Sequence, residues 1–149
     1  MSENVELCDK LLGKHFGVLA FLAALGLLVV VAGMILCIKK MLPKPLVVFL
    51  ACCTVVFAVP TVYIVRGFQD LHNQDYVVYY GDFTVSERNQ SNGNLTLQDE
   101  DQTSVRMEGD FAGDFPLSNG EHTGYVVYAK RTRLLLIYDP YENPLAEMN

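Results

Sequence analysis

Residues 16–38 read FGVLAFLAALGLLVVVAGMILCI, and residues 46–65 read LVVFLACCTVVFAVPTVYIV. Neither run contains a charged side chain. As an α-helix, the first run of 23 residues extends about 34 Å, enough to cross a hydrocarbon core of about 30 Å. A cleavable signal peptide has a shorter apolar centre and ends at small residues, which neither run does. We therefore predict two transmembrane helices.

The segment between the two runs, KKMLPKP at residues 39–45, is short and basic. A loop of this length joins antiparallel neighbours, so the spans are expected to form a hairpin. Its three lysines are matched in number by Lys10, Lys14 and Arg66 at the other boundary. The density of charge in the loop favours a cytoplasmic loop and an extracytoplasmic C-terminal domain, whereas Lys10 and Lys14 argue for the reverse. The predicted location is the cell membrane, with two spans.

The charge of the chain changes sign after the second run. Residues 67–149 carry 14 acidic and 5 basic side chains, a formal charge of −9, whereas the first 66 residues carry +3. An acidic domain argues against nucleic acid as a partner, because phosphate contacts require a basic face. The four cysteines have neither the spacing of a disulfide framework nor that of a metal site. They are Cys8, Cys37, Cys52 and Cys53.

From residue 75 the apolar side chains alternate, which indicates β-strands with one buried face. Five strands are predicted, over residues 75–87, 94–98, 103–108, 123–129 and 134–139. Gly81, in the middle of the first, predicts a bulge or bend. In the first three strands we expect one face to point inward, formed by Val77, Tyr79, Phe83, Val85, Leu95, Leu97, Val105 and Met107.

These elements predict an α+β membrane protein, in which a two-helix transmembrane hairpin precedes a small antiparallel five-stranded β domain. An OB-like or SH3-like barrel suits five short strands, because closure removes exposed edges. The predicted organisation is a tail (1–15), the first span (16–38), a basic loop (39–45), the second span (46–66), a linker (67–74), the β domain (75–139) and a second tail (140–149).

One feature runs against the acidic trend of the domain. Lys130, Arg131 and Arg133 cluster at the turn between the last two strands, and Tyr128 and Tyr138 lie on the flanking strands. Together they form the candidate partner-binding site, suited to an acidic partner protein, an anionic polymer or an anionic membrane surface. The alternative interpretation is a solvated turn whose charges protect the apolar run at residues 134–137 from aggregation.

No arrangement of residues predicts catalysis, a cofactor or a metal. The histidines, His15, His72 and His122, are scattered, and no serine or cysteine lies in a nucleophile context. Three aspartates of the domain offer paired carboxylates, but abundant acidic residues usually serve to solvate a surface. These are Asp82, Asp110 and Asp114.

The spans contain no intramembrane charge, which transporters and proton relays require. We therefore expect a non-enzymatic membrane protein whose hairpin anchors a β-barrel interaction module that binds a protein or envelope partner, such as an accessory subunit or a toxin-immunity protein. The alternative is a structural or regulatory subunit acting through its helices. Small residues in the spans allow close packing within the hairpin or in a homo-oligomer.

Overall fold

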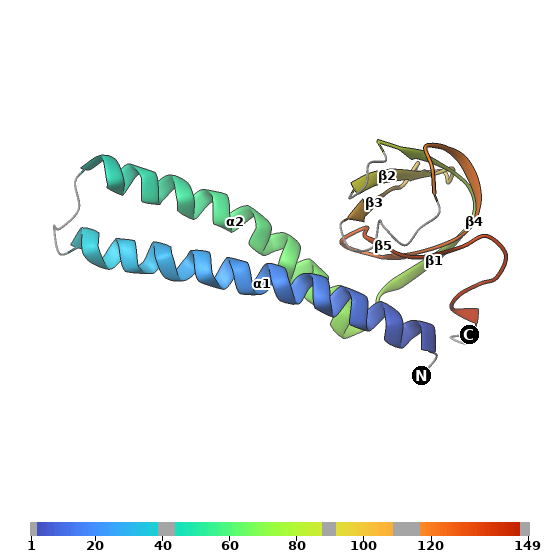
Figure 1. Cartoon of the computed structure of the whole chain (residues 1–149), viewed down its shortest axis with the longest axis horizontal. Coiled ribbons are helices and arrows are strands. Elements are labelled where there is room, and N and C mark those ends of the chain that lie inside the picture. The colour runs from blue at the N-terminus through green and yellow to red at the C-terminus, as the bar shows by residue number, and fades with distance from the viewer. Residues whose placement is uncertain (1–2, 39–43, 88–91, 109–116, 147–149) are drawn as a thin grey trace.

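The computed structural model describes residues 3–38, 44–87, 92–108 and 117–146. Within the second helix it describes side chains from Pro60 onward, together with those of Val48 and Cys52. Two antiparallel helices form a long arm, and a curled β-sheet forms a head at one end of it (Figure 1). The first turn of the first helix and the last described residues lie side by side, and the Asn4 side-chain amide donates to the Pro144 carbonyl at 2.7 Å.

The helices are longer than the apolar runs from which they were predicted. Helix α1 spans Glu3–Ile38, and α2 spans Lys44–Asn73, continuing through Pro60. The segments expected as a tail (1–15) and a linker (67–74) are therefore largely helical, which corrects the sequence-based boundaries. The physical reason is packing: the first turns of α1 and the last turns of α2 bury apolar side chains against the head, so helix continues beyond the uncharged runs.

By length and composition, one helix among the described residues can cross a membrane: α1, over Asn4–Leu36. At 36 residues, α1 is about 54 Å long. A helix of this length exceeds a hydrocarbon core of about 30 Å. Its N-terminal turns contact the head.

The head is one five-stranded sheet in the order β3-β2-β1-β4-β5, in which all neighbours are antiparallel. Its edges meet at one parallel bridge between Arg106 and Leu134, where the Arg106 amide donates to the Arg133 carbonyl at 2.7 Å. The sheet therefore curls into a half-closed barrel. The strands are β1 (Tyr76–Ser86), β2 (Asn92–Leu97), β3 (Ser104–Glu108), β4 (Gly120–Ala129) and β5 (Leu135–Asp139).

The inside of the curl holds the first of two hydrophobic cores. All eight side chains expected to point inward from the first three strands belong to it or pack against it, which confirms the predicted register. Phe83, Leu95, Leu97, Val105 and Met107 have no exposed surface. The alternation of apolar and polar residues in the sequence thus identifies the inner face of this sheet.

The second core lies between the outer face of the β4–β5 hairpin and the helices. Val5, Cys8, Leu12 and Phe16 recur at helical spacing on α1 and pack against this face. The apolar run at residues 134–137 is explained by the same layering. Leu135 belongs to the inner core, whereas its neighbours on both sides belong to the outer one. A strand buried on both faces needs no alternation.

The predicted bend at Gly81 is present. Gly81 pairs with Gly124 across β1 and β4, and both have φ of +156°. A Cβ at Gly124 would lie 2.9 Å from the Asp139 carbonyl oxygen, so a side chain is excluded there. Beyond this bend, the second half of β1 pairs with both β2 and β4, whereas its first half pairs with β4 alone.

Candidate functional site

The turn between β4 and β5, Lys130–Arg133, is held by α2 rather than projecting freely into solvent. Arg133 closes it in the left-handed conformation (φ 53°), and its amide donates to the Ala129 carbonyl at 2.8 Å. Lys130 and Arg133 are exposed, but Thr132 is buried. The name "basic turn" is used below for these four residues.

Asp70, on α2, binds the basic turn. The side chain is completely buried, and its carboxylate accepts the Arg131 amide at 3.1 Å, the Thr132 amide at 2.9 Å and the Thr132 hydroxyl at 3.0 Å. The Arg131 guanidinium lies 3.3 Å from the same carboxylate and also contacts Asp75. An acidic side chain near a helix C-terminus opposes the helix dipole, so these hydrogen bonds are what stabilise Asp70 there.

The predicted partner-binding residues do not form one surface. Tyr128 is buried in the inner core, and Tyr138 packs against that core with its ring edge-on to Phe83 at 5.7 Å between centroids. Arg131 is occupied by the two aspartates. Lys130 and Arg133 remain as exposed basic side chains of the predicted set, and a partner-binding role for them stays a prediction.

A second contact joins the opposite edge of the sheet to both helices. Glu108, at the end of β3, lies 3.4 Å from Nε2 of His15 on α1 and accepts a hydrogen bond of 3.5 Å from the Tyr63 hydroxyl on α2. Arg106 lies 3.8 Å from the same carboxylate. The contact with His15 is the main cause that lowers the pKa of Glu108 below its usual range.

This shift predicts a pH dependence. A carboxyl whose folded-state pKa is lowered stabilises the fold above its unfolded-state pKa, and the stabilisation is lost as pH falls through the folded-state pKa. We expect the difference in unfolding free energy between the wild type and Glu108→Gln to be present above the pKa of an unfolded glutamate, about 4.3, and to shrink as pH falls below it. Urea unfolding at each pH measures it. A difference that stays unchanged as pH falls below that value would contradict this assignment.

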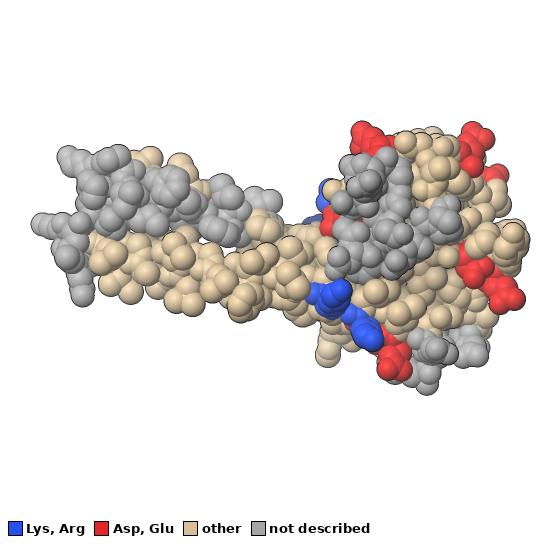
Figure 2. All heavy atoms as spheres, in the orientation of Figure 1, with Lys and Arg blue, Asp and Glu red and all other residues tan. Residues whose placement is uncertain are grey.

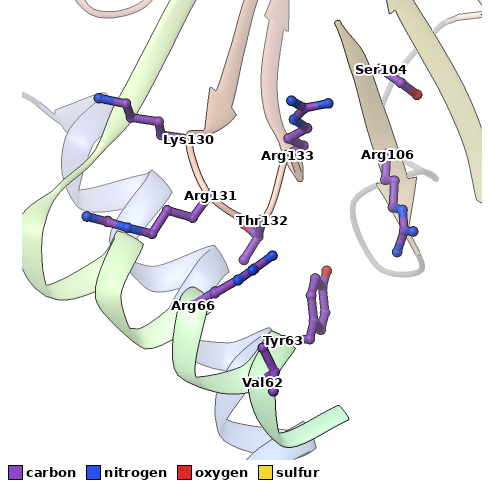
Figure 3. A pocket seen from close by; sticks show the side chains of 9 residues that line it. All are labelled: Val62, Tyr63, Arg66, Ser104, Arg106, Lys130, Arg131, Thr132 and Arg133. Carbon is purple, nitrogen blue, oxygen red and sulfur yellow. The ribbon is translucent and has the colours of Figure 1, made fainter. Parts of the chain in front are cut away.

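Between α2, β3 and the basic turn lies an open cavity of about 820 Å³ (Figure 3). Four of its lining residues are apolar or carry hydroxyls: Val62, Tyr63, Ser104 and Thr132. Arg66 and Tyr63 reach from α2 toward the turn and β3, while Lys130 points away from them. The other described residues that line it are all basic: Arg66, Arg106, Lys130, Arg131 and Arg133. This set is called the basic cavity below.

Sequence reasoning found the basic turn but missed the residues that complete the cavity. Arg66 was visible only as the charge that ends the second apolar run, and Arg106 only as an outward position of a strand. Asp70 fell in a presumed linker. A single aspartate gives little signal in the sequence, because the residues that Asp70 contacts lie 61 and 62 positions further along the chain.

Among the described residues, no group of three metal-ligating side chains comes together. Of the three aspartates considered for catalysis, Asp82 is exposed on β1, whereas Asp110 and Asp114 lie outside the described residues. His15 contacts Glu108, His72 is exposed near the end of α2, and His122 stacks on Phe83. No protein-family model, curated protein or solved structure matches this chain.

Proposed function

We propose that this chain is a non-enzymatic integral membrane protein, in which the helices insert as a transmembrane hairpin and hold the head at the membrane surface, where it binds a protein or envelope partner. The surface of α1 supports the insertion of this helix into a membrane. Apolar side chains are exposed around this helix, with Phe21, Leu28 and Val29 64–67% exposed. An apolar surface of this extent requires lipid or a covering protein.

The alignment of the helices supports insertion of both. The ring of Phe16, the first residue of the uncharged run in α1, lies against Gly67, just past the end of the run in α2. The two runs therefore change from charged to uncharged at one level along the arm. Figure 2 shows the described part of the arm without charged side chains on this face, basic side chains where arm and head meet, and acidic ones over the head.

The head supplies the interaction surface in this proposal. Its topology, with β1 between β2 and β4 and the edge strands meeting in parallel, favours the OB-like over the SH3-like type. On its outer face, Tyr80 is 61% exposed and pairs with Tyr125 at 4.5 Å between ring centroids, beside the exposed Val78. Exposed aromatic side chains are enriched at protein interfaces.

A photo-crosslinking residue tests this proposal in native membranes. Placed at Tyr80 it reports on the head, and placed at Leu28 it reports on the arm. We expect one discrete adduct from Tyr80 and none from Leu28. The reverse pattern would favour the alternative, a subunit that acts through its helices. A species that stays at the monomer mass of 16.6 kDa with both probes would contradict an interaction module.

We further propose that the lysine-rich loop faces the cytoplasm and the head faces outward, following the density of charge in residues 39–45. A cysteine in place of Asp101, an exposed residue of the β2–β3 turn, gives the test. In intact cells an impermeant thiol reagent is expected to label Asp101→Cys and not the unmodified protein. Labelling only after the cells are permeabilised would reverse the orientation.

A further inference from the structure

The basic cavity is an exception in the head, which is otherwise acidic. Residues 67–149 carry a formal charge of −9, yet the described side chains that line this cavity include no acidic residue. Glu108 and the aspartates that bind Arg131 compensate two of its five cations. Among the described residues, Arg66, Lys130 and Arg133 form no ion pair. A net positive cavity in a negative domain indicates an anionic ligand.

The chemistry of the lining suits a phosphate group. Arginine presents donors in a planar fork that matches phosphate oxygens, and three of the cations are Arg66, Arg106 and Arg133. The hydroxyl group of Ser104 adds an uncharged donor. A volume of about 820 Å³ falls within the usual range of ligand sites, about 300–1,000 Å³, and exceeds what a phosphate alone would fill. The cavity therefore has room for a ligand larger than the inorganic ion.

A neighbouring groove offers room for the rest of such a ligand. It has a volume of about 450 Å³ and follows one face of α2, along Thr61, Val65 and Gln69, sharing Val62 and Arg66 with the basic cavity. Val62 and Val65 end the uncharged run, and Arg66 is the first charged residue after it. A molecule that occupies both spaces has a phosphate beside Arg66 and an apolar chain toward the arm.

We propose that the basic cavity binds the phosphate of an anionic phospholipid headgroup, with the start of an acyl chain along Val62 and Val65. This inference rests on the proposed function in one respect, because the arm must lie in the bilayer for the cavity to meet the headgroups. The bound lipid bridges α2, β3 and the basic turn, and fixes the head at a defined height above the membrane.

Native mass spectrometry of the full chain in detergent, titrated with phosphatidylglycerol or phosphatidylcholine, tests the site. We expect the wild type to bind one phosphatidylglycerol ~10-fold more tightly than phosphatidylcholine, which corresponds to one favourable charged contact. The double variant Arg66→Gln, Arg133→Gln is expected to lose this preference. The matched control Lys10→Gln, Lys14→Gln removes the same charge from the junction but outside the cavity, and is expected to keep it.

Two results would overturn the assignment. Equal phosphatidylglycerol binding by the wild type and the cavity variant would show that the lipid binds elsewhere. Displacement of the lipid by millimolar inorganic phosphate would show that the cavity takes a water-soluble phosphate instead. Flotation with neutral phosphatidylcholine vesicles separates this inference from the proposed function. If the chain floats but shows no preference for phosphatidylglycerol, the lipid site is absent and the proposed function stands. If the chain does not float, it is not a membrane protein, and the proposed function fails.

Discussion

Replacing Asp70 with alanine is expected to lower the free energy of unfolding by about 3 kcal/mol. The substitution leaves the Arg131 amide, the Thr132 amide and the Thr132 hydroxyl without their acceptor. The site is dry, because the Asp70 side chain is completely buried in the wild type. Each buried donor that loses its partner costs about 1–3 kcal/mol. For a head of this size the midpoint of thermal unfolding should fall by about 12 °C or more. Circular dichroism in detergent measures it.

Two further variants make the Asp70 result specific. Asp70→Asn keeps one acceptor oxygen and should cost roughly half as much. Asp101→Ala removes a carboxylate from an exposed turn and should change stability by less than about 0.5 kcal/mol. Hydrogen exchange of the Arg131 and Thr132 amides should accelerate in Asp70→Ala. Unchanged exchange at these two amides would show that the carboxylate does not hold the basic turn.

Replacing Gly67 with alanine is expected to destabilise the junction of helices and head by about 2–3 kcal/mol. In a helix without such a contact, replacing glycine with alanine stabilises the fold by about 1 kcal/mol. The sign of the change in unfolding free energy therefore distinguishes the two cases. A Cβ at Gly67 would lie 2.2 Å from the ring of Phe16, which is completely buried in the outer core. The ring must therefore move, and the core loses its packing. Urea unfolding measures the change.

Gly17 is the matched control, because it lies in α1 and a Cβ there meets no atom within 4 Å. Gly17→Ala should be neutral or stabilising. A smaller side chain at position 16 should relieve the clash with the new Cβ. The double variant Gly67→Ala, Phe16→Leu should therefore be less destabilised than the sum of the two single changes. A Gly67→Ala protein as stable as the wild type would remove the Phe16–Gly67 contact from the account.

The first three strands were predictable because each buries one face and exposes the other. The alternation of Leu95, Leu97, Val105 and Met107 reports burial inside the curl, and all four are completely buried. The helical extensions were not predicted, although Val5, Cys8, Leu12 and Phe16 already have the spacing of an amphipathic helix. Charged residues between them made the segment resemble a polar tail, and the face that they cover is formed by strands more than a hundred residues away.

The candidate site was predictable only in part, for a related reason. A turn between two apolar strands, rich in Lys and Arg, is visible in the sequence. The cavity depends on Arg66 and Arg106, which come from two other elements, and on the contact of Asp70 with the turn. The sequence placed the two aromatic residues on the flanking strands but did not say which face of each strand they occupy. Tyr128 points into the inner core, because Val127 and Ala129 take the face toward the helices.

The central claim is that the uncharged part of the arm lies in lipid. Spin labels at Leu28, in the arm, and at Asp101, in the head, test it most directly when the reconstituted protein is exposed to oxygen and to a water-soluble nickel complex. We predict that the label at Leu28 relaxes with oxygen and is shielded from nickel, while the label at Asp101 does the opposite. Access of the nickel complex to position 28 in liposomes would contradict the account.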